Sequence, residues 1–324
     1  MTPDLFRKLV ADASLAPSVH NVQPARWRLE RDSVLLLEDM NVRLSAADPT
    51  GRDAEMSLGA AFEGFAMAAA EHGLSANYTS IDADTADLRP VARLQFAKKA
   101  TTDPLNAYVE TRQSWRGVFT PPTDADRATA RGLTGPDCTV FTAPDTIALI
   151  AQLLDTASFG FMDQDDFRRE LVSWMRLRKG HPRWEQDGLN AQAMQLGILE
   201  KLGASVVMGV GFRPLAGLGL AAPLLAEAVK TTSAAAIVAF HRPQDEAPFE
   251  SGRTFYRAWL RIEAAGFGAA VLAALADDRT SNATMAAMAG LNADQHLISA
   301  FRIGRRPDDA RVPRARRALD HLIV

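Results

Sequence analysis

Three segments of the chain carry apolar residues at the spacing of an α-helix. They are residues 4–14, 57–74 and 254–264. In the middle segment Leu58, Phe62 and Phe65 lie on one face, and Gly73 supplies a stop signal. A further helix is expected to start after residues 101–105, and residues 146–231 have a mostly helical pattern. These patterns predict a chain with long helices in both its first and its last third.

Shorter apolar runs between the helices predict strands. RWRLE (residues 26–30) and VLLLED (residues 34–39) are expected to form a hairpin joined across residues 31–33. Further strands are predicted at residues 91–97, 234–241 and 300–303. We expect these strands and the long helices to form a fold of the α+β class.

Two of the predicted helices share a spacing of glycine and phenylalanine. Gly59 and Gly73 are separated by the same distance along the chain as Gly252 and Gly266, and Phe62 and Phe255 take the same place within it. Alanine-rich helices that end at glycine are common, so the internal repeat is weak. It nevertheless suggests two related halves whose long helices meet near a pseudo-twofold axis.

Composition narrows the class of protein. With 324 residues, 47% of them hydrophobic and 23% charged, the chain can bury a large core as one big domain or two ordinary ones. This excludes a disordered or fibrous protein. A net charge of −3 argues against attraction of the whole surface to nucleic acid, although local basic patches remain open. Cys138 is the only cysteine, which excludes an internal disulfide and suits a reducing cytoplasm.

No segment is expected to enter a membrane. The opening residues, MTPDLFRKLVADA, mix charged and apolar positions and lack the apolar core of a signal peptide. The most apolar stretch, LGASVVMGVGFRPLAGLGLAAPLLAEAV, is interrupted by Arg213, Pro214 and Pro223 and falls short of an uncharged span. We interpret it as a buried segment or a mobile cover.

Small polar groups gather in APSVHNVQP, residues 16–24, between a helix and a strand. Two prolines stiffen this segment, while Ser18 and Asn21 offer short hydrogen-bonding groups. It is either a binding loop or simply a stiff connection. Arg112 and Arg116 in RQSWRGVF are four residues apart and would share one face of a helix, with Ser114 nearby. Guanidinium forks bind phosphate by paired hydrogen bonds, but such arginines can also form an ordinary solvated helix face.

These motifs together resemble those of nitroreductase-type FMN oxidoreductases. APSVHNVQP is similar to that family's loop A-P-S-x-x-N-x-Q-P-W, although the tryptophan is displaced to Trp27. RQSWR is similar to its R-x-S-x-R motif, and PRARR, residues 313–317, to the basic pair near its C-terminus. Ordinary members carry R-x-S-x-R first and the A-P-S loop later, in a shorter chain. Here the order is reversed.

The resemblance implies a nitroreductase dimer fused into one chain, as in the Acg-like branch of the family. Residues 1–105 and 106–324 would form two nitroreductase-like halves, each with an antiparallel sheet and a long central helix, and a probable lid lies at about residues 160–230. One FMN would bind between the halves. The resemblance assigns it to Pro17, Ser18, Asn21, Gln23, Arg112, Ser114, Arg116, Leu272, Ala273, Arg314 and Arg316.

A reciprocal second site is not expected. It would need an R-x-S-x-R motif near residue 5, where the chain reads DLFRKLV, and an A-P-S loop near residue 158, where it reads TASFGFMDQDD. The chain would therefore hold one FMN. It would act as a monomeric pseudo-dimer or as a weak homodimer.

The resemblance implies an enzyme that takes a hydride from NADH or NADPH and passes it to a nitroaromatic, quinone or enone. Flavin carries the redox chemistry, so no catalytic side chain and no metal is expected, and the partner is a small-molecule electron acceptor. Two alternatives stay open. A closed lid would make the chain an FMN-storing or FMN-sequestering protein with little turnover, and without flavin it would be a structural helical protein.

Overall fold

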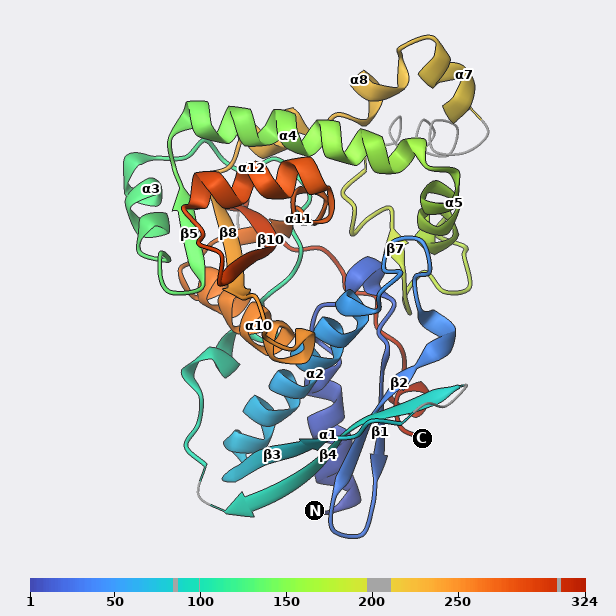
Figure 1. Cartoon of the computed structure of the whole chain (residues 1–324). Helices are drawn as coiled ribbons and strands as arrows, with labels where there is room; N and C mark the ends of the chain where they lie inside the picture. The colour runs from blue at the N-terminus through green and yellow to red at the C-terminus, as the bar shows by residue number, and fades with distance from the viewer. Residues whose placement is uncertain (84–86, 99, 197–210, 308–309) are drawn as a thin grey trace.

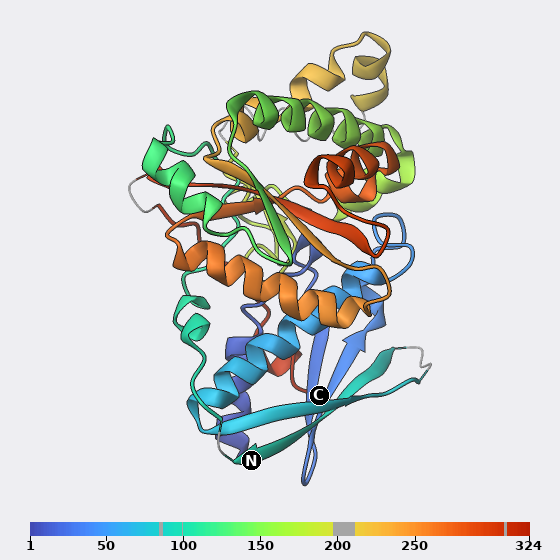
Figure 2. The same cartoon turned by 60° about the vertical axis from the view of Figure 1, so that its left-hand side comes forward.

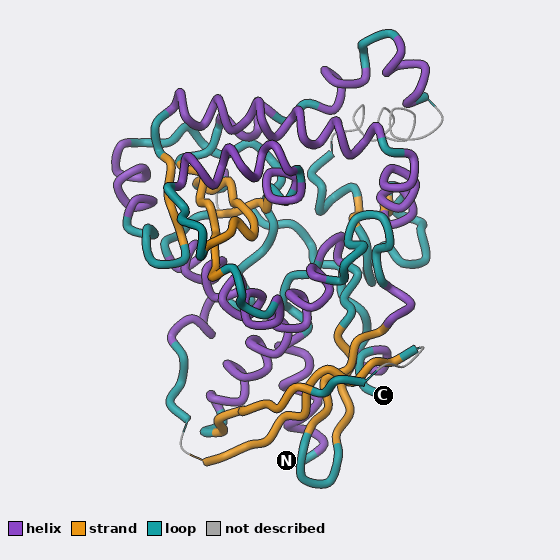
Figure 3. Tube along the Cα trace, viewed as in Figure 1, coloured by secondary structure: helices purple, strands orange, loops and turns teal. Residues whose placement is uncertain are grey.

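The computed structural model describes residues 1–83, 87–98, 100–196, 211–307 and 310–324 (Figure 1). Its main frame consists of two four-stranded antiparallel sheets with helices packed against them (Figure 3). The first sheet contains β1 (Ala25–Leu29), β2 (Val34–Asp39), β3 (Leu74–Ser80) and β4 (Leu88–Lys98). The second contains β5 (Cys138–Phe141), β8 (Ala236–Pro243), β9 (Gly268–Val271) and β10 (Gln295–Gly304). The predicted α+β class is confirmed.

The two sheets have the same topology. Their strand orders are β1-β2-β4-β3 and β5-β8-β10-β9. In each sheet the third strand along the chain is therefore an edge strand, and the fourth lies between it and the second. In each sheet a long helix connects the second strand to the third. These helices are α2 (Arg52–Glu71) and α10 (Pro248–Ala264).

Helices α2 and α10 cross each other between the two sheets (Figure 2). The crossing is close because glycine occupies it on both sides. A Cβ atom added at Gly59 would lie 1.9 Å from the carbonyl oxygen of Phe249, and one added at Gly252 would lie 2.0 Å from that of Met56. The contact of the two helices, predicted from the glycine spacing, is confirmed.

Both long helices also pack their apolar faces onto a sheet. Helix α1 (Pro3–Ala13) and α2 cover one face of the first sheet, where the rings of Trp27 and Phe65 stack at 4.7 Å. Helix α10 covers one face of the second sheet. The other face of that sheet is buried under α4 (Pro144–Asp163), α11 (Ala274–Asp277) and α12 (Arg279–Ala289). The second half is therefore a three-layer structure.

A long insertion separates β5 from β8 in the second sheet. It consists of α4, α5 (Asp165–Trp174), the short parallel strands β6 (Met175–Arg176) and β7 (Leu189–Asn190), α7 (Phe212–Gly217), α8 (Ala221–Leu225) and α9 (Ala228–Thr232). It coincides with the predicted lid region. Before β5 lies α3 (Asp124–Arg131), whose start carries a capping box of Thr123 and Asp126.

Part of the most apolar stretch lies on the surface. Leu218, which directly follows α7, is 73% exposed, and Leu224, which lies in α8, is 60% exposed. The interpretation of this part of the stretch as buried is therefore wrong. Residues 202–210 of the stretch lie outside the described residues. No helix among the residues that the structure describes has the length and apolar character needed to cross a membrane.

The C-terminal segment of the chain crosses from the second sheet to the edge of the first. The C-terminal segment of the second half returns to the first sheet, where Trp27 donates to the carbonyl of Leu322 (2.8 Å) and Val324 donates to that of Trp27 (2.9 Å). On the way it passes the loop between α1 and β1. Single turns of 3₁₀ helix lie in that loop (Val19–Asn21), after β2 (Met40–Val42), before the arginine motif (Pro104–Tyr108) and near the C-terminus (Leu319–His321).

Several predicted elements have different limits in the structure. Helix α2 starts earlier than residue 57, because the negative charges of Asp53 and Glu55 in its first turn interact favourably with the positive end of the helix dipole. At the other end, Leu74 is the first residue of β3 and not the last residue of the helix. The helix expected after residues 101–105 is only one 3₁₀ turn. Within residues 146–231, the part from 175 to 195 is mostly loop. The sequence patterns missed several elements, most of which are too short for clear periodicity: α3, β3, β5, β6, β7, β9, α11 and α12.

Candidate functional site

A cavity of about 380 Å³ lies where the loop after α1, the central helices and the C-terminal segment meet. Its volume falls within the range of roughly 300–1,000 Å³ that is usual for small-molecule sites. Most of the residues predicted to bind a cofactor line it. They are Pro17, Ser18, Asn21, Arg112, Ser114, Arg116, Ala273, Arg314 and Arg316. Folding thus brings together three sequence motifs that are far apart along the chain.

Gln23 and Leu272 are not among the residues that line this cavity, so their predicted role as direct cofactor contacts is not supported. The amide of Gln23 is already used within the protein, since it donates to the carbonyl of Gln186 (2.7 Å) and accepts from the backbone N–H of Arg317 (3.0 Å). Leu272 belongs to the apolar cluster beneath the second sheet. Both residues stabilise the walls of the cavity from behind.

The loop of residues 17–24 has an unusual backbone. His20, Asn21 and Gln23 have positive φ angles of 46°, 56° and 54°, a conformation that side chains other than glycine rarely adopt. Hydrogen bonds hold the loop in this shape. The hydroxyl of Ser18 accepts from the N–H of Gln23 (3.0 Å), and the amide of Asn21 donates to the carbonyl of Ala315 (3.1 Å). Such strain persists only where the surroundings enforce it, as they do at binding sites.

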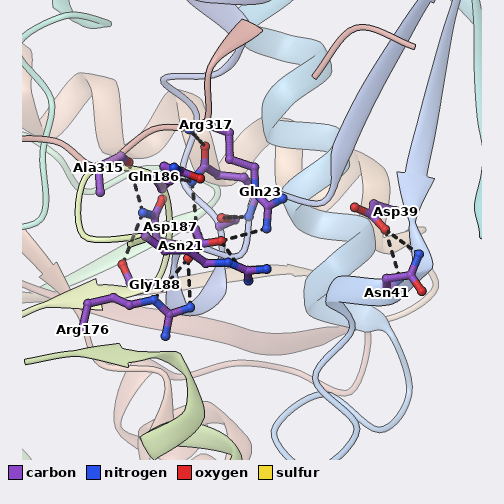
Figure 4. A network of polar contacts seen from close by, with 12 residues as sticks. Asn21, Gln23, Asp39, Asn41, Arg176, Gln186, Asp187, Gly188, Ala315 and Arg317 are labelled. Carbon is purple, nitrogen blue, oxygen red and sulfur yellow. Dashed lines mark hydrogen bonds and ion pairs between the residues drawn. The ribbon is translucent and has the colours of Figure 1, made fainter. Parts of the chain in front are cut away.

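The insertion and the C-terminal segment are tied to this loop by a polar network (Figure 4). The carboxylate of Asp187, which is almost fully buried, pairs with Arg176 and Arg317, both at 2.9 Å. The N–H of Gly188 donates to the carbonyl of Asn21 (3.3 Å). Gly188 and Leu189 also line the cavity, so this network fixes part of the insertion as a wall of the site.

Arg112, Ser114 and Arg116 do not lie on a helix, which corrects the sequence-based expectation. Ser114 forms a parallel bridge with Ala269 of β9, and the N–H of the next residue donates to the Ala269 carbonyl (2.8 Å). In an extended segment, residues two apart point to the same side. Arg112, Ser114 and Arg116 are each two residues apart, so in this extended segment their side chains point to the same side. All three therefore still line one cavity.

Four guanidinium groups line the cavity without a carboxylate partner among the described residues: those of Arg112, Arg116, Arg314 and Arg316. Arg112 donates to the carbonyl of Leu15 (2.6 Å), and its guanidinium lies 4.5 Å from the ring centroid of Trp259. Arg314 and Arg316 likewise donate to backbone carbonyls, those of Glu110 (2.7 Å) and Ser14 (2.6 Å). Arg116 makes no hydrogen bond to the described part of the chain.

Burial and mutual repulsion disfavour the charges of these arginines. Burial, followed by the charges of Arg112 and Arg314, lowers the pKa of Arg316 to about 9. The pKa of Arg314 falls to about 10 from burial and from the charge of Arg112. Buried cations without anionic partners are costly, and a bound anion removes that cost. The chemistry of this donor set therefore fits a dianionic phosphate.

The rest of the cavity wall is largely apolar. Helix α10 contributes Phe255 and Trp259, while Met56 and Ala60 come from α2 and Ile298 from β10. From the sequence, Phe255 was noted only as part of the glycine and phenylalanine repeat, and Trp259 was not predicted as a site residue. Phe255 and Trp259 are one helical turn apart on a helix that contains glycine. This spacing was the signal in the sequence that could have identified them as residues of the cavity wall. A cavity with a cationic side and an apolar side fits a ligand that carries both a phosphate and a flat ring system.

Two relatives with curated names match part of this chain. It is 40% identical over 77 residues to the protein acg of Mycobacterium tuberculosis, which is named provisionally as an NAD(P)H nitroreductase; the match covers 24% of this chain and 23% of the relative. It is 36% identical over 73 residues to Rv3131 of the same organism, which has the same provisional name, covering 22% of this chain and 21% of the relative. Over these stretches the chain is similar to proteins that are named as NAD(P)H nitroreductases.

The match spans less than a quarter of the length of either relative, and no family model matches the chain. Solved structures overlap it more widely but less closely. The FMN-dependent nitroreductase NfnB from Mycobacterium smegmatis, in complex with NADPH, is 18% identical and has a TM-score of 0.37, covering 67% of this chain and 96% of its own. A provisionally named nitroreductase from Anabaena variabilis is 11% identical with a TM-score of 0.43, covering 95% and 90%.

Proposed function

We propose that the chain is an FMN-dependent oxidoreductase that takes a hydride from NADH or NADPH and passes it to a nitroaromatic, quinone or enone. The observation that carries this proposal is the cavity in which four guanidinium groups without carboxylate partners face an apolar wall. The names of the two relatives, both NAD(P)H nitroreductases, agree with it.

In this proposal Arg112, Arg314 and Arg316 bind the phosphate of FMN. Their guanidinium groups form charge-assisted hydrogen bonds with its oxygens, which offsets the cost of burying the arginines. Phe255 and Trp259 bury the ring system of the flavin, and Ser18 and Asn21 fix the loop at its polar edge. Bound FMN would supply the two-electron chemistry, which amino-acid side chains do not provide.

We also propose that residues 1–105 and 106–324 are the two halves of a fused pseudo-dimer and that the chain acts as a monomer in the cytoplasm. The common strand order of the two sheets and the reciprocal glycine contacts of α2 and α10 support this interpretation. Both halves contribute to the cavity, the first through residues 17–21 and the second through the four arginines.

A second function, storage of FMN with little turnover, is favoured by the insertion. Gly188, Leu189 and Ala193 line the cavity, and the ion pairs of Asp187 hold this segment in place. A wall fixed in this way would restrict access to the flavin. The two functions share the cofactor and differ in whether reductant reaches it.

The absorbance spectrum of the purified protein distinguishes these functions. An oxidoreductase is expected to carry flavin absorbance that bleaches within seconds after anaerobic addition of NADPH or NADH. A storage protein is expected to stay yellow. A colourless protein that also fails to take up added FMN would contradict both.

A further inference from the structure

Arg52 joins two carboxylates that come from different halves of the molecule. Its Nη2 atom lies 2.9 Å from the carboxylate of Asp53, in the first turn of α2, and 2.8 Å from that of Asp277, at the end of α11. Because one nitrogen atom contacts both, the two carboxyl groups are close neighbours. Asp53 and Arg52 also line the cavity, so the pair lies at its wall.

This carboxyl pair is set to hold a proton near neutral pH. Burial, followed by the negative charge of Asp53, raises the pKa of Asp277 to about 6, and burial also raises the pKa of Asp53. Asp48, in the loop before α2, adds a further negative charge, while Arg52 opposes the rise. His296 of β10 also faces Arg52, and burial and that positive charge lower its pKa, which favours the neutral ring.

The other titratable groups of the cavity are poorly suited to give up a proton. Burial and the charge of Arg116 lower the pKa of His20 to about 4, so its ring is neutral at pH 7. The remaining titratable residues that the structure places in the cavity wall are arginines, which hold their protons. Among the described lining residues, Asp53 is the carboxyl group, and it shares Arg52 with Asp277.

We propose that Asp53 is the catalytic proton donor to the electron acceptor and that Asp277 is a positioning residue that keeps a proton on the pair. This inference rests on the proposed function. When an enone receives a hydride at its β-carbon, the electron pair of the C=C bond forms a new double bond between the α-carbon and the carbonyl carbon. The electron pair of the C=O bond moves to the oxygen, which becomes the oxygen of an enolate. The carboxyl group of Asp53 gives its proton to that oxygen, an enol forms, and Asp53 becomes a carboxylate that regains a proton from water through the pair.

The first test separates the two half-reactions. The FMN-loaded protein is reduced anaerobically with one equivalent of NADPH and then mixed with 2-cyclohexenone between pH 5 and 9, and flavin absorbance reports both steps. For Asp53→Asn we expect flavin reduction at about the wild-type rate and reoxidation slowed about 100-fold, a usual contribution of a general acid. Asp53→Glu is expected to recover part of the loss. For Asp277→Asn, the pH above which reoxidation slows is expected to move downward, because Asp53 loses a negative neighbour.

Asp163→Asn is the matched control. Asp163 also pairs with an arginine, Arg213 (2.9 Å), but its side chain is 52% exposed and it is not among the residues lining the cavity. Its rates are expected to equal those of the wild type. Normal reduction together with unchanged reoxidation in Asp53→Asn would overturn the proton-donor role alone. A wild type that neither NADPH nor NADH reduces would refute the proposed function, and the donor role with it.

The second test does not use the loaded enzyme. Infrared spectra of the flavin-free protein between pH 5 and 8 report protonated carboxyl groups, because their C=O stretch is separate from that of carboxylates. We expect the wild type to lose such a band across this range, Asp163→Asn to retain the same change, and Asp53→Asn and Asp277→Asn each to reduce it. An identical band in all four proteins would show that the pair holds no proton and would overturn the inference.

Discussion

At the scale of single residues, the cavity depends on arginines whose charges the protein does not neutralise. Arg112 is held from two sides, since its buried guanidinium stacks on Trp259 and donates to the carbonyl of Leu15. This position is fixed before any ligand arrives. A phosphate that binds there meets a donor that needs no further ordering.

Replacing Arg112 by alanine is expected to weaken FMN binding by about 2–5 kcal/mol, by analogy with truncated buried charge pairs. Riboflavin lacks the phosphate, so its affinity is expected to change far less. Fluorescence quenching titrations of both flavins measure the contrast. Arg305→Ala is the matched control, because Arg305 also stacks on an aromatic ring, that of Phe267 at 4.4 Å, but is not among the residues lining the cavity. Equal losses for FMN and riboflavin would contradict a phosphate contact.

At the scale of elements, the crossing of α2 and α10 decides how the two halves meet. Gly59 and Gly252 let the helix backbones approach more closely than any side chain would allow. Beside the crossing, Glu63 of α2 accepts from Arg253 (2.9 Å) and Arg257 (2.8 Å) of α10. A helix pair held this tightly positions Met56, Ala60, Phe255 and Trp259 in one cavity wall.

Gly252→Ala is expected to lower the free energy of unfolding by at least about 1–3 kcal/mol, because its Cβ atom would collide with the backbone of Met56 and the helices would have to separate. Gly160→Ala, in α4, is the control. An added Cβ meets nothing within 4 Å there, so alanine is expected to be neutral or stabilising by up to about 1 kcal/mol. Urea denaturation measures both, and equal effects of the two substitutions would argue against a tight crossing.

At the scale of the whole molecule, the titration of Asp277 makes the free energy of unfolding depend on pH. Its pKa is raised from 3.8 to about 6, so the folded protein binds this proton more tightly than the unfolded chain does. That contribution to stability is fully present below about pH 4 and is lost as the pH rises through 6. Other carboxyl groups titrate too, so the informative quantity is the difference between a variant and the wild type.

From pH 4 to pH 7, the stability of Asp277→Asn relative to the wild type is expected to rise by about 1–3 kcal/mol, since one pKa unit corresponds to about 1.4 kcal/mol. Urea denaturation at several pH values measures this difference. Asp163→Asn provides the baseline for loss of an exposed carboxylate. A difference between Asp277→Asn and the wild type that does not vary with pH would mean that Asp277 titrates normally.

The whole molecule is also expected to bind one FMN per chain. The segments where a reciprocal site would have to lie, DLFRKLV and TASFGFM, fall within α1 and α4, and Arg7 pairs with Asp320 on the surface (2.8 Å). Acid-released flavin measured against protein concentration gives the ratio. Two flavins per chain would mean that these helical segments take part in a second site.

The sequence by itself determined the local features of this protein. The periods of apolar residues located α1, α2, α10 and the strands β1, β2, β4, β8 and β10, because burial of one face requires those periods. The motifs, read through the family resemblance, named much of the polar part of the cavity wall, including the four arginines without carboxylate partners among the described residues. The repeated spacing of glycines indicated that α2 and α10 meet.

Only the tertiary structure decided which groups meet. The arginine motif is extended because an edge strand, β9, pairs with it, and no local pattern records that partner. Gln23 became a structural residue because Gln186 and Arg317, distant along the chain, use its amide. Trp259 reached the cavity and Asp277 reached Arg52 in the same way. Local patterns fix the elements, whereas long-range pairing fixes the environment of each side chain, and that environment sets its charge and its chemistry.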